Sequence, residues 1–400
     1  MSFSKDVSFI LGDMDFWFSP KIRQPFCKEV VSCLADMSTI LLSSKNTRNY
    51  PDIINFAYWC RKANLKRLEA RHYSKHLRIG RGSVFHLTPS NVPVNFAFSL
   101  AFGLLAGNTN LVRVSNLNLP QVTMICNALS CALIRSENDD LRSMAKVISY
   151  PRNDDITKEI SASSDARVIW GGDVTVSHIR SMLTRPRCVD ICFADRFSMS
   201  VLGAQSVLDA DDRASDLLFK AFVRDAFLFE QSACSSPHLI LWQGGKLTVE
   251  QAKMKFWRGV GGLLRKRQAP PINQAIERFS LACEFAIQND SLKIDTFRAL
   301  DLLRIELDKV PANIDQQRGR FGLFFEANDN SLKQFTNIVN SKYQTVTYYG
   351  VDPEEIVSAV LDGGLHGVDR VVPIGDALNM DALWDGFDMI EGLSRILVRH

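Results

Sequence analysis

The feature that most constrains this chain is a regular alternation of short strands and helices that begins near residue 83. The first predicted strands are Ser83–Leu87, Asn110–Val114, Ala145–Ser149 and Ala166–Trp170. Predicted helices lie between and after them, at about 93–105, 120–136 and 174–183, and short Gly, Asn or Ser turns join the segments. Strands that alternate with helices in this way are typical of a doubly wound α/β domain.

The alternation starts again after residue 197. Further strands are expected at Ser198–Leu202, Leu239–Trp242, Arg320–Phe325, Val346–Tyr349 and Asp369–Gly375. Helices are expected at about 211–229, 274–288, 296–307 and from 352 onward. The sequence therefore predicts an α/β fold with two doubly wound domains, divided as 1–75 (a helical region), 76–197, 198–368 and 369–400 (a strand and a helix).

Composition excludes several classes of protein. The 47 basic and 44 acidic residues leave a net charge of only +3, too little to attract nucleic acid or an anionic membrane without a local patch. The densest basic run, Arg61–Arg81, is read as a solvated helix face, with contact to an anionic partner as the less common alternative. The longest apolar run, Val92–Gly107, contains Asn95 and Ser99 and is too short to span a membrane.

The nine cysteines show no CxxC pair and no zinc spacing, so we expect no metal site and a reducing compartment. The first residues lack a basic segment followed by an apolar one, which argues against a secretory signal. Together these features predict a cytoplasmic location.

Cys234 is the candidate nucleophile. It lies at the joint between an apolar helix pattern and the strand Leu239–Trp242, among the small residues Ala233, Ser235 and Ser236. Most cysteines are simply small core residues, and that reading also fits Cys234. A thiol at such a turn can nevertheless project into a cleft, where its thiolate could attack a carbonyl.

Asn91 is the candidate partner of that thiol. It follows a predicted strand and precedes a helix whose early Pro93 suits the first turn. Asn91 could cap this helix, or its amide could donate a hydrogen bond to a developing oxyanion, a contact worth about 3 kcal/mol of barrier. The sequence leaves both roles open.

Three stretches could line a dinucleotide groove, because glycine lets the backbone approach a phosphate. They are Gly107–Thr109, Arg113–Ser115 and Trp170–Asp173. Arg113 could pair with a ribose 2′-phosphate, which would favour NADPH over NADH. The chain has no GxGxxG fingerprint. The histidines His86, His238 and His366 are more simply read as structural.

Taken together, these stretches resemble the aldehyde dehydrogenase superfamily, and within it the acyl-CoA reductases, typified by the reductase of the bacterial luminescence fatty-acid reductase complex. The resemblance covers most of the chain. Its motifs are Tyr50-Pro51-Asp52, Ala57-Tyr58-Trp59-Cys60, Thr88-Pro89-Ser90-Asn91-Val92-Pro93, Ala106-Gly107-Asn108-Thr109, Val168-Ile169-Trp170-Gly171-Gly172, Gln231 with Ala233-Cys234-Ser235-Ser236-Pro237, and Trp384-Asp385-Gly386.

The resemblance implies a nucleotide-binding domain over 76–197 and a catalytic domain over 198–368, with the active site in the cleft between them. Cys234 takes the place of the nucleophile, and Asn91 with the backbone N–H of Cys234 takes that of the oxyanion hole. The cofactor-binding positions are Thr88, Pro89, Ser90, Arg113, Ser115, Trp170, Gly171 and Gly172.

One departure from the superfamily is informative. Oxidising aldehyde dehydrogenases carry a glutamate that activates water to hydrolyse the acyl-enzyme, and the corresponding segment here, Val189–Ser198, lacks it. Asp190 and Asp195 are the nearby carboxylates. Without a water-activating base the acyl-enzyme would persist until a hydride reaches it, so the pattern favours reduction.

The sequence therefore predicts NADPH-dependent reduction of an acyl thioester to an aldehyde through acyl-Cys234. The expected donor is a fatty acyl-CoA, with an acyl-carrier protein, another acyl-protein or an acyl-transferring partner enzyme as alternatives. Related proteins often form dimers or tetramers, so the resemblance also implies a homo-oligomer. Two other hypotheses are an oxidative aldehyde dehydrogenase and a non-catalytic subunit that keeps the fold.

Overall fold

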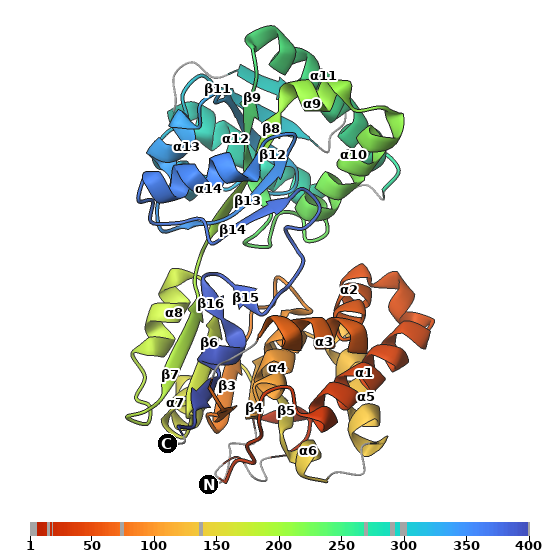
Figure 1. Cartoon of the computed structure of the whole chain (residues 1–400), viewed down its shortest axis with the longest axis vertical. Coiled ribbons are helices and arrows are strands. Elements are labelled where there is room, and N and C mark those ends of the chain that lie inside the picture. Colours follow the sequence, from red (N-terminus) through yellow and green to blue (C-terminus); the bar gives the residue numbers. More distant parts are fainter. Residues whose placement is uncertain are drawn as a thin grey trace. The chain divides into compact units, whose positions relative to one another are not determined.

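The computed structural model describes residues 6–13, 17, 19–72, 76–135, 139–267, 271–288, 293–296 and 302–398. The chain forms two compact units, shown in Figure 1. Unit 1 comprises residues 1–194 and 380–400, and unit 2 comprises residues 195–379. The sequence had instead divided the chain near residue 197 and treated 369–400 as one segment. In the structure, the strand of that segment belongs to unit 2 and its short helix to unit 1.

Unit 1 is built on a six-stranded sheet in the order β1-β5-β4-β3-β6-β7. Its strands are β1 (Ser8–Leu11), β3 (Ser83–Leu87), β4 (Thr109–Val114), β5 (Ala145–Ser149), β6 (Ala166–Trp170) and β7 (Val189–Phe193). All neighbouring strands are parallel except the pair β1–β5. The strand order reverses between β3 and β6, the position where doubly wound sheets bind ligands.

The helices of unit 1 come from both the N-terminal region and the alternating region. They are α1 (Lys28–Ser43), the 3-10 helix η1 (Asn46–Asn49), α2 (Pro51–Trp59), α3 (Lys62–Arg71), α4 (Asn95–Leu105), α5 (Pro120–Arg135), α6 (Asp139–Ser143), α7 (Asp154–Ala162) and α8 (Asp173–Arg180). Helix α1 packs against α2, α4 and α5, so the N-terminal helices pack on helices α4 and α5 of the alternating region.

The C-terminal segment also packs on unit 1. Strand β17 (Ser394–Ile396) pairs antiparallel with β2 (Arg78–Gly80), and β15 (Leu383–Trp384), β16 (Phe387–Asp388) and α15 (Met389–Gly392) precede it. Arg71 pairs with Asp381, Arg78 with Glu391, and the Arg81 side chain donates to the Gly392 carbonyl. Part of the basic run Arg61–Arg81 therefore binds the C-terminal segment to the rest of unit 1.

Unit 2 holds a seven-stranded sheet in the order β10-β11-β12-β9-β8-β13-β14, parallel except for the pair β10–β11. Its strands are β8 (Phe197–Gly203), β9 (Pro237–Gln243), β10 (Lys293–Thr296), β11 (Leu303–Leu307), β12 (Leu323–Asn328), β13 (Tyr343–Tyr349) and β14 (Arg370–Pro373). Its helices are α9 (Ala204–Asp209), α10 (Asp212–Phe227), α11 (Lys246–Leu264), α12 (Ile272–Gln288), the 3-10 helix η2 (Ile314–Gln316), α13 (Lys333–Ile338) and α14 (Pro353–Asp362).

One predicted helix is wrong. The sequence favoured a helix over 296–307, but residues 303–307 form β11, and residues 297–301 lie outside the described part of the chain. In β11 Leu303, Ile305 and Leu307 enter the core while Arg304 turns to the buried Glu326 on β12. This alternation has a period of two residues, as a strand requires.

Candidate functional site

The carboxyl edge of the sheet in unit 1 gathers most of the predicted cofactor-binding residues. Leu87, at the end of β3, pairs with Arg113 on β4 and with Ile169 on β6. The segments that follow these three strands therefore leave the sheet side by side, at the point where the strand order reverses. They contain Thr88, Pro89, Ser90 and Asn91 after β3, Ser115 after β4, and Gly171 and Gly172 after β6.

Arg113 supplies a positive charge to this edge. Its guanidinium is half-buried, donates to the Tyr150 carbonyl at 3.3 Å and lies 5.3 Å from the centre of the Tyr150 ring. Within the described residues no carboxylate forms an ion pair with Arg113. A planar, uncompensated guanidinium at a sheet edge is suited to bind an anion such as a phosphate.

Trp170 is held by two contacts. Its ring stacks on Phe193 with the centroids 3.8 Å apart, and its indole N–H donates to the Ser99 hydroxyl at 3.0 Å. Ser99 lies 2.8 Å from Nδ1 of His86, whose Nε2 lies 3.1 Å from the Asn110 amide oxygen. Since that oxygen can only accept, Nε2 carries the proton, and burial lowers the pKa of His86 to about 4. His86 is thus a neutral structural residue.

Gly172 precedes helix α8 in the N-cap position, and no side chain caps the helix there. A Cβ built at Gly172 would meet no atom within 4 Å, so nothing inside the protein requires glycine at this position. The first-turn N–H groups of α8 face this open position, which suits an anionic group.

Asn91 is exposed and comes before the first turn of α4. The N-cap position of α4 belongs to Val94, and no side chain caps this helix. Asn91 lies three residues before that position, so it does not occupy the N-cap of α4.

Gly107–Thr109 does not belong to this edge. Gly107 and Asn108 precede β4 and Thr109 begins it, at the opposite end of the strand from Arg113. Asn108 is fully buried, accepts from the backbone N–H groups of Arg81 and Gly82, and donates to the Leu393 carbonyl. The prediction that this stretch lines the cofactor groove is wrong, because the stretch secures the C-terminal segment instead.

Cys234 lies in unit 2, in the loop between α10 and β9, and is partly exposed. Its loop reaches the amino edge of the sheet, where β9 begins at Pro237. The Ser198 hydroxyl, on β8, donates to the Cys234 carbonyl at 2.7 Å, and the Ser236 hydroxyl donates to the Asp225 carbonyl at 2.7 Å. The loop is thereby fixed at Cys234 itself and two residues beyond it.

Gln231 is the residue whose role sequence reasoning missed. Its side chain is buried, its amide N–H groups donate to the carbonyls of Pro237 and Leu323, and its amide oxygen accepts from the Gly322 N–H. Glu230 and Gln231 both adopt the left-handed conformation, with φ of 49° and 58°. A glutamine directly before the small residues Ser232 and Ala233 was the available signal for such an anchor.

Two arginines reach the same edge of unit 2 from other loops. Arg318, before β12, pairs with Asp195 at 2.9 Å, and Arg196, before β8, pairs with Asp369. In unit 1, Asp190 forms a two-pronged ion pair with the buried Arg167, at 2.8 and 2.7 Å. Asp190 and Asp195 are therefore both bound to guanidinium groups.

Two buried titratable groups lie close to the Cys234 loop in the chain. His238 donates from Nδ1 to the Gly319 carbonyl at 2.8 Å, and burial lowers the pKa of His238 to about 3, so the ring is neutral. Asp225, on α10, accepts from the Gly375 N–H at 2.6 Å through Oδ2, whereas its Oδ1 has no hydrogen-bond partner among the described residues. Burial raises the pKa of Asp225 to about 7.

All nine cysteines are free of disulfides. Among the described residues, no group of three or more His, Cys, Asp or Glu side chains is arranged to hold a metal ion. Nor does any described helix have the length and apolar character needed to cross a membrane.

Comparison with solved structures gives the class of fold. A lactaldehyde dehydrogenase superposes with a TM-score of 0.64 at 13% identity, covering 95% of this chain and 87% of that one. The NADP-dependent glyceraldehyde-3-phosphate dehydrogenase of Bacillus halodurans gives a TM-score of 0.62 at 14% identity, with 96% and 87% covered. The predicted α/β, aldehyde-dehydrogenase-like fold is confirmed.

Sequence comparison then places the chain within that class. The profile of the acyl-CoA reductase (LuxC) family matches residues 46–274, more than half of the chain, and the chain belongs to this family. It is also similar to the long-chain acyl-protein thioester reductase of Vibrio harveyi, with 28% identity over 184 residues. That match spans 44% of this chain and only 35% of the relative's length.

Proposed function

We propose that this protein reduces an acyl thioester to an aldehyde with NADPH, through an acyl group carried on Cys234. The observation that carries the proposal is the Cys234 loop of a LuxC-family chain, fixed by buried hydrogen bonds at a sheet edge. The similarity to a reductase named for long-chain acyl-protein thioesters supports the same class of substrate.

In the first step the Cys234 thiolate attacks the thioester carbonyl, and the carbonyl electrons move to oxygen. Asn91 and the backbone N–H of Cys234 are proposed to stabilise this oxyanion, a contribution of about 3 kcal/mol per donor. The tetrahedral adduct collapses, the donor leaves as a thiolate, and Cys234 retains the acyl group. One thioester is exchanged for another, so no activated water is needed.

In the second step the acyl carbonyl is reduced. When bound, the nicotinamide cofactor supplies a hydride to the carbonyl carbon, and the same donors hold the resulting oxyanion. Collapse of this thiohemiacetal anion expels the Cys234 thiolate and releases the aldehyde. Both steps use Cys234 as the thiolate, the form of cysteine that acts as a nucleophile.

The residues at the carboxyl edge of unit 1 fit such a cofactor on two counts. Gly172 leaves open space before the N-terminus of α8, where a diphosphate would meet N–H groups. Arg113 lies two strands away from β6 with no carboxylate bound to it, which suits a ribose 2′-phosphate. Thr88, Pro89, Ser90, Ser115, Trp170 and Gly171 would line the remaining edge.

The proposal also includes the acyl donor, the location in the cell and the oligomeric state. The donor is a fatty acyl-CoA, an acyl-carrier protein or another acyl-protein, and an acyl-transferring enzyme would supply it. A cytoplasmic location suits nine free cysteines and a thiol nucleophile. A homo-oligomer stays a prediction.

Among the alternatives, oxidation of aldehydes to acids needs a carboxylate that activates water. The two candidate carboxylates, Asp190 and Asp195, are bound to Arg167 and Arg318. Releasing Asp190 would leave the buried Arg167 without its counter-charge, at a cost of about 3 kcal/mol. This arrangement favours the reductive direction.

The test is the stoichiometry of the reaction with tetradecanoyl-CoA. We expect one NADPH consumed for each tetradecanal and each free CoA formed. The same enzyme given tetradecanal and NADP⁺ should form tetradecanoyl-CoA only when CoA is added. Formation of tetradecanoic acid without CoA would instead establish the oxidative alternative.

A further inference from the structure

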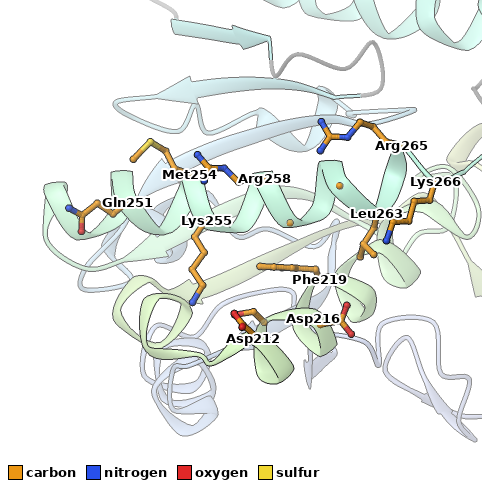
Figure 2. Close-up of a pocket in the computed structure, with 13 residues that line it drawn as sticks. Asp212, Asp216, Phe219, Gln251, Met254, Lys255, Arg258, Leu263, Arg265 and Lys266 are labelled. Carbon is orange, nitrogen blue, oxygen red and sulfur yellow. The ribbon is translucent and has the colours of Figure 1, made fainter.

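A groove between α10 and α11 lies outside the proposed reaction site. Its volume is about 900 Å³, and its walls come entirely from unit 2. Figure 2 shows Met254, Arg258 and Arg265 projecting from one side of α11, whereas Lys255 points toward α10. The ring of Phe219 forms the floor.

Glycines shape this groove. A Cβ at Gly259 would lie 2.1 Å from the Phe219 ring, so the floor requires glycine there. At Gly262 the nearest atom would be the end of the Arg265 side chain at 3.8 Å, so the packing within the chain does not require glycine. A glycine inside a helix costs about 1 kcal/mol relative to alanine. The notch that Gly262 leaves is therefore available to an outside group.

The charges in the groove are unbalanced. Asp216 is paired with Lys220, and Lys255 donates to the carbonyls of Leu208 and Ala210. The remaining charged residues of the lining are the cations Arg258, Arg265 and Lys266 and the anion Asp212. Within the described residues none of these three cations forms an ion pair. Because Lys255 keeps its charge when it donates to carbonyls, the lining as a whole has four cations and two anions, an excess of two positive charges.

The groove also exposes apolar surface. Met254 is 59% exposed on the wall, and Leu247, about two turns away on the same face of α11, is 75% exposed. Arg258 and Arg265 are seven residues apart, or about 10 Å along the helix axis. Cations spread over this length beside exposed apolar side chains fit an extended acidic surface better than a single small anion.

The groove is connected to the nucleophile loop. Arg267, next to Lys266, donates to the Phe227 carbonyl at 3.1 Å and pairs with Glu230 at 2.9 Å. Glu230 precedes Cys234 by four residues, so their Cα atoms are at most about 14 Å apart. A partner seated in the groove would thus lie beside the loop that carries the thiol.

We propose that the α10–α11 groove docks an acidic carrier protein that presents the acyl group as a thioester. The proposal rests on the proposed function in that it names the donor. Net positive charge disfavours a second copy of this chain, because the two grooves would repel each other, and it attracts a partner rich in Asp and Glu.

The test uses acyl carrier protein loaded with a tetradecanoyl thioester. Its binding is measured to the Cys234→Ala chain, which cannot accept the acyl group, and to the same chain with Arg258→Glu and Arg265→Glu. A control carries Lys62→Glu and Lys66→Glu on α3, an equal change of charge on an exposed helix of unit 1. We expect the Kd of the loaded carrier protein to rise by roughly tenfold or more for the groove variant and to stay unchanged for the control. The affinity should also fall as the salt concentration rises.

Turnover separates the sources of any effect. With native Cys234, the groove variant should have a raised KM for the acyl-carrier protein and an unchanged KM for tetradecanoyl-CoA. Equal losses with both donors would place the CoA phosphates in the groove, and a lost dimer on sedimentation would place a second copy there; either result overturns the proposal. Undiminished binding in the groove variant overturns it too. Binding without reduction of either donor would keep the docking surface and refute the proposed reaction instead.

Discussion

The two units share one architecture but present their candidate residues at opposite ends of their strands. In unit 1 the residues follow the carboxyl ends of β3, β4 and β6. In unit 2 Cys234 precedes β9 and lies at the amino edge. The first arrangement is the usual ligand site of a doubly wound sheet. The second places the thiol on a loop, which side-chain hydrogen bonds must hold in position.

The two units also hold their candidate residues in place by different interactions. At the edge of unit 1, helix starts and glycine provide binding groups through the backbone, at Gly172 and α8. In unit 2, the left-handed residues Glu230 and Gln231 place the loop at a cost of about 1 kcal/mol or more each. The buried hydrogen bonds of Gln231, Ser198 and Ser236 offset that cost. A cofactor edge can thus be built from backbone, whereas a fixed thiol needs dedicated side chains.

The largest effect is expected from Cys234→Ala. Aldehyde formation should fall by at least about 1,000-fold, because the thiol forms the covalent intermediate. NADPH affinity, which depends on unit 1, should be unchanged in a fluorescence titration. Cys283→Ala, at an exposed cysteine of unit 2, serves as the control and should retain full activity. Substantial turnover by Cys234→Ala would break the assignment of chemistry to unit 2.

Gln231→Ala tests whether side chains hold the nucleophile loop. The change leaves the Gly322 N–H and the Pro237 and Leu323 carbonyls without their buried partner, so unfolding should require about 3 kcal/mol less. Chemical denaturation followed by tryptophan fluorescence measures the loss. Gln251→Ala removes an exposed glutamine of α11 and should change stability by less than about 0.5 kcal/mol. Equal, small effects of both substitutions would contradict the anchoring role.

Arg113→Ala tests the edge of unit 1. The Kd for NADPH should rise by roughly 30-fold, because a charged hydrogen bond to phosphate is lost, while the Kd for NADH changes little. Arg152→Ala, at an exposed arginine just after β5, should leave both constants unchanged. Equal weakening of NADPH and NADH by Arg113→Ala would show that Arg113 does not read the 2′-phosphate.

Asp225→Asn gives the smallest effect, and its sign depends on pH. Burial raises the pKa of Asp225 to about 7 in the folded chain, above its ordinary value of 3.8. From pH 3.8 to 7 the folded state therefore keeps a proton that the unfolded state has lost, and stability contributed by this group falls as the pH rises. Asn removes that dependence, so the variant should gain about 1 kcal/mol relative to the wild type between pH 5 and pH 6. A constant difference across this range would show that Asp225 does not titrate there.

How far the sequence predicted the fold depends on the kind of strand. Ser83–Leu87, Ala145–Ser149 and Ala166–Trp170 were predicted with their observed bounds, because each is a short, mostly apolar run between turn residues, as expected of a strand buried on both faces. β11 was missed because the leucines and charged residues around it also fit a helical period. β12 begins three residues later than predicted, since Phe321 and Gly322 adopt positive φ and delay the strand.

Some features of the candidate site could be predicted from the sequence, and others could not. Residues next to strand ends, such as Arg113 and Gly172, could be placed from the strand pattern alone. The ion pair Arg167–Asp190 depends on the lateral pairing of β6 with β7, which no local pattern encodes. The place of Asn108 before the predicted strand Asn110–Val114 already put it at the opposite end from Arg113. Its contact with Leu393, 285 residues away in the chain, could not be predicted from the sequence.

The most direct test of the central claim is the mass of the intact protein after mixing with tetradecanoyl-CoA. Without NADPH, the account predicts one added tetradecanoyl group that peptide mapping locates on Cys234, and none on Cys234→Ala. Adding NADPH should remove the group as tetradecanal within the time of a turnover. An acyl group on another residue, or one released as tetradecanoic acid in the presence of NADPH, would contradict the account.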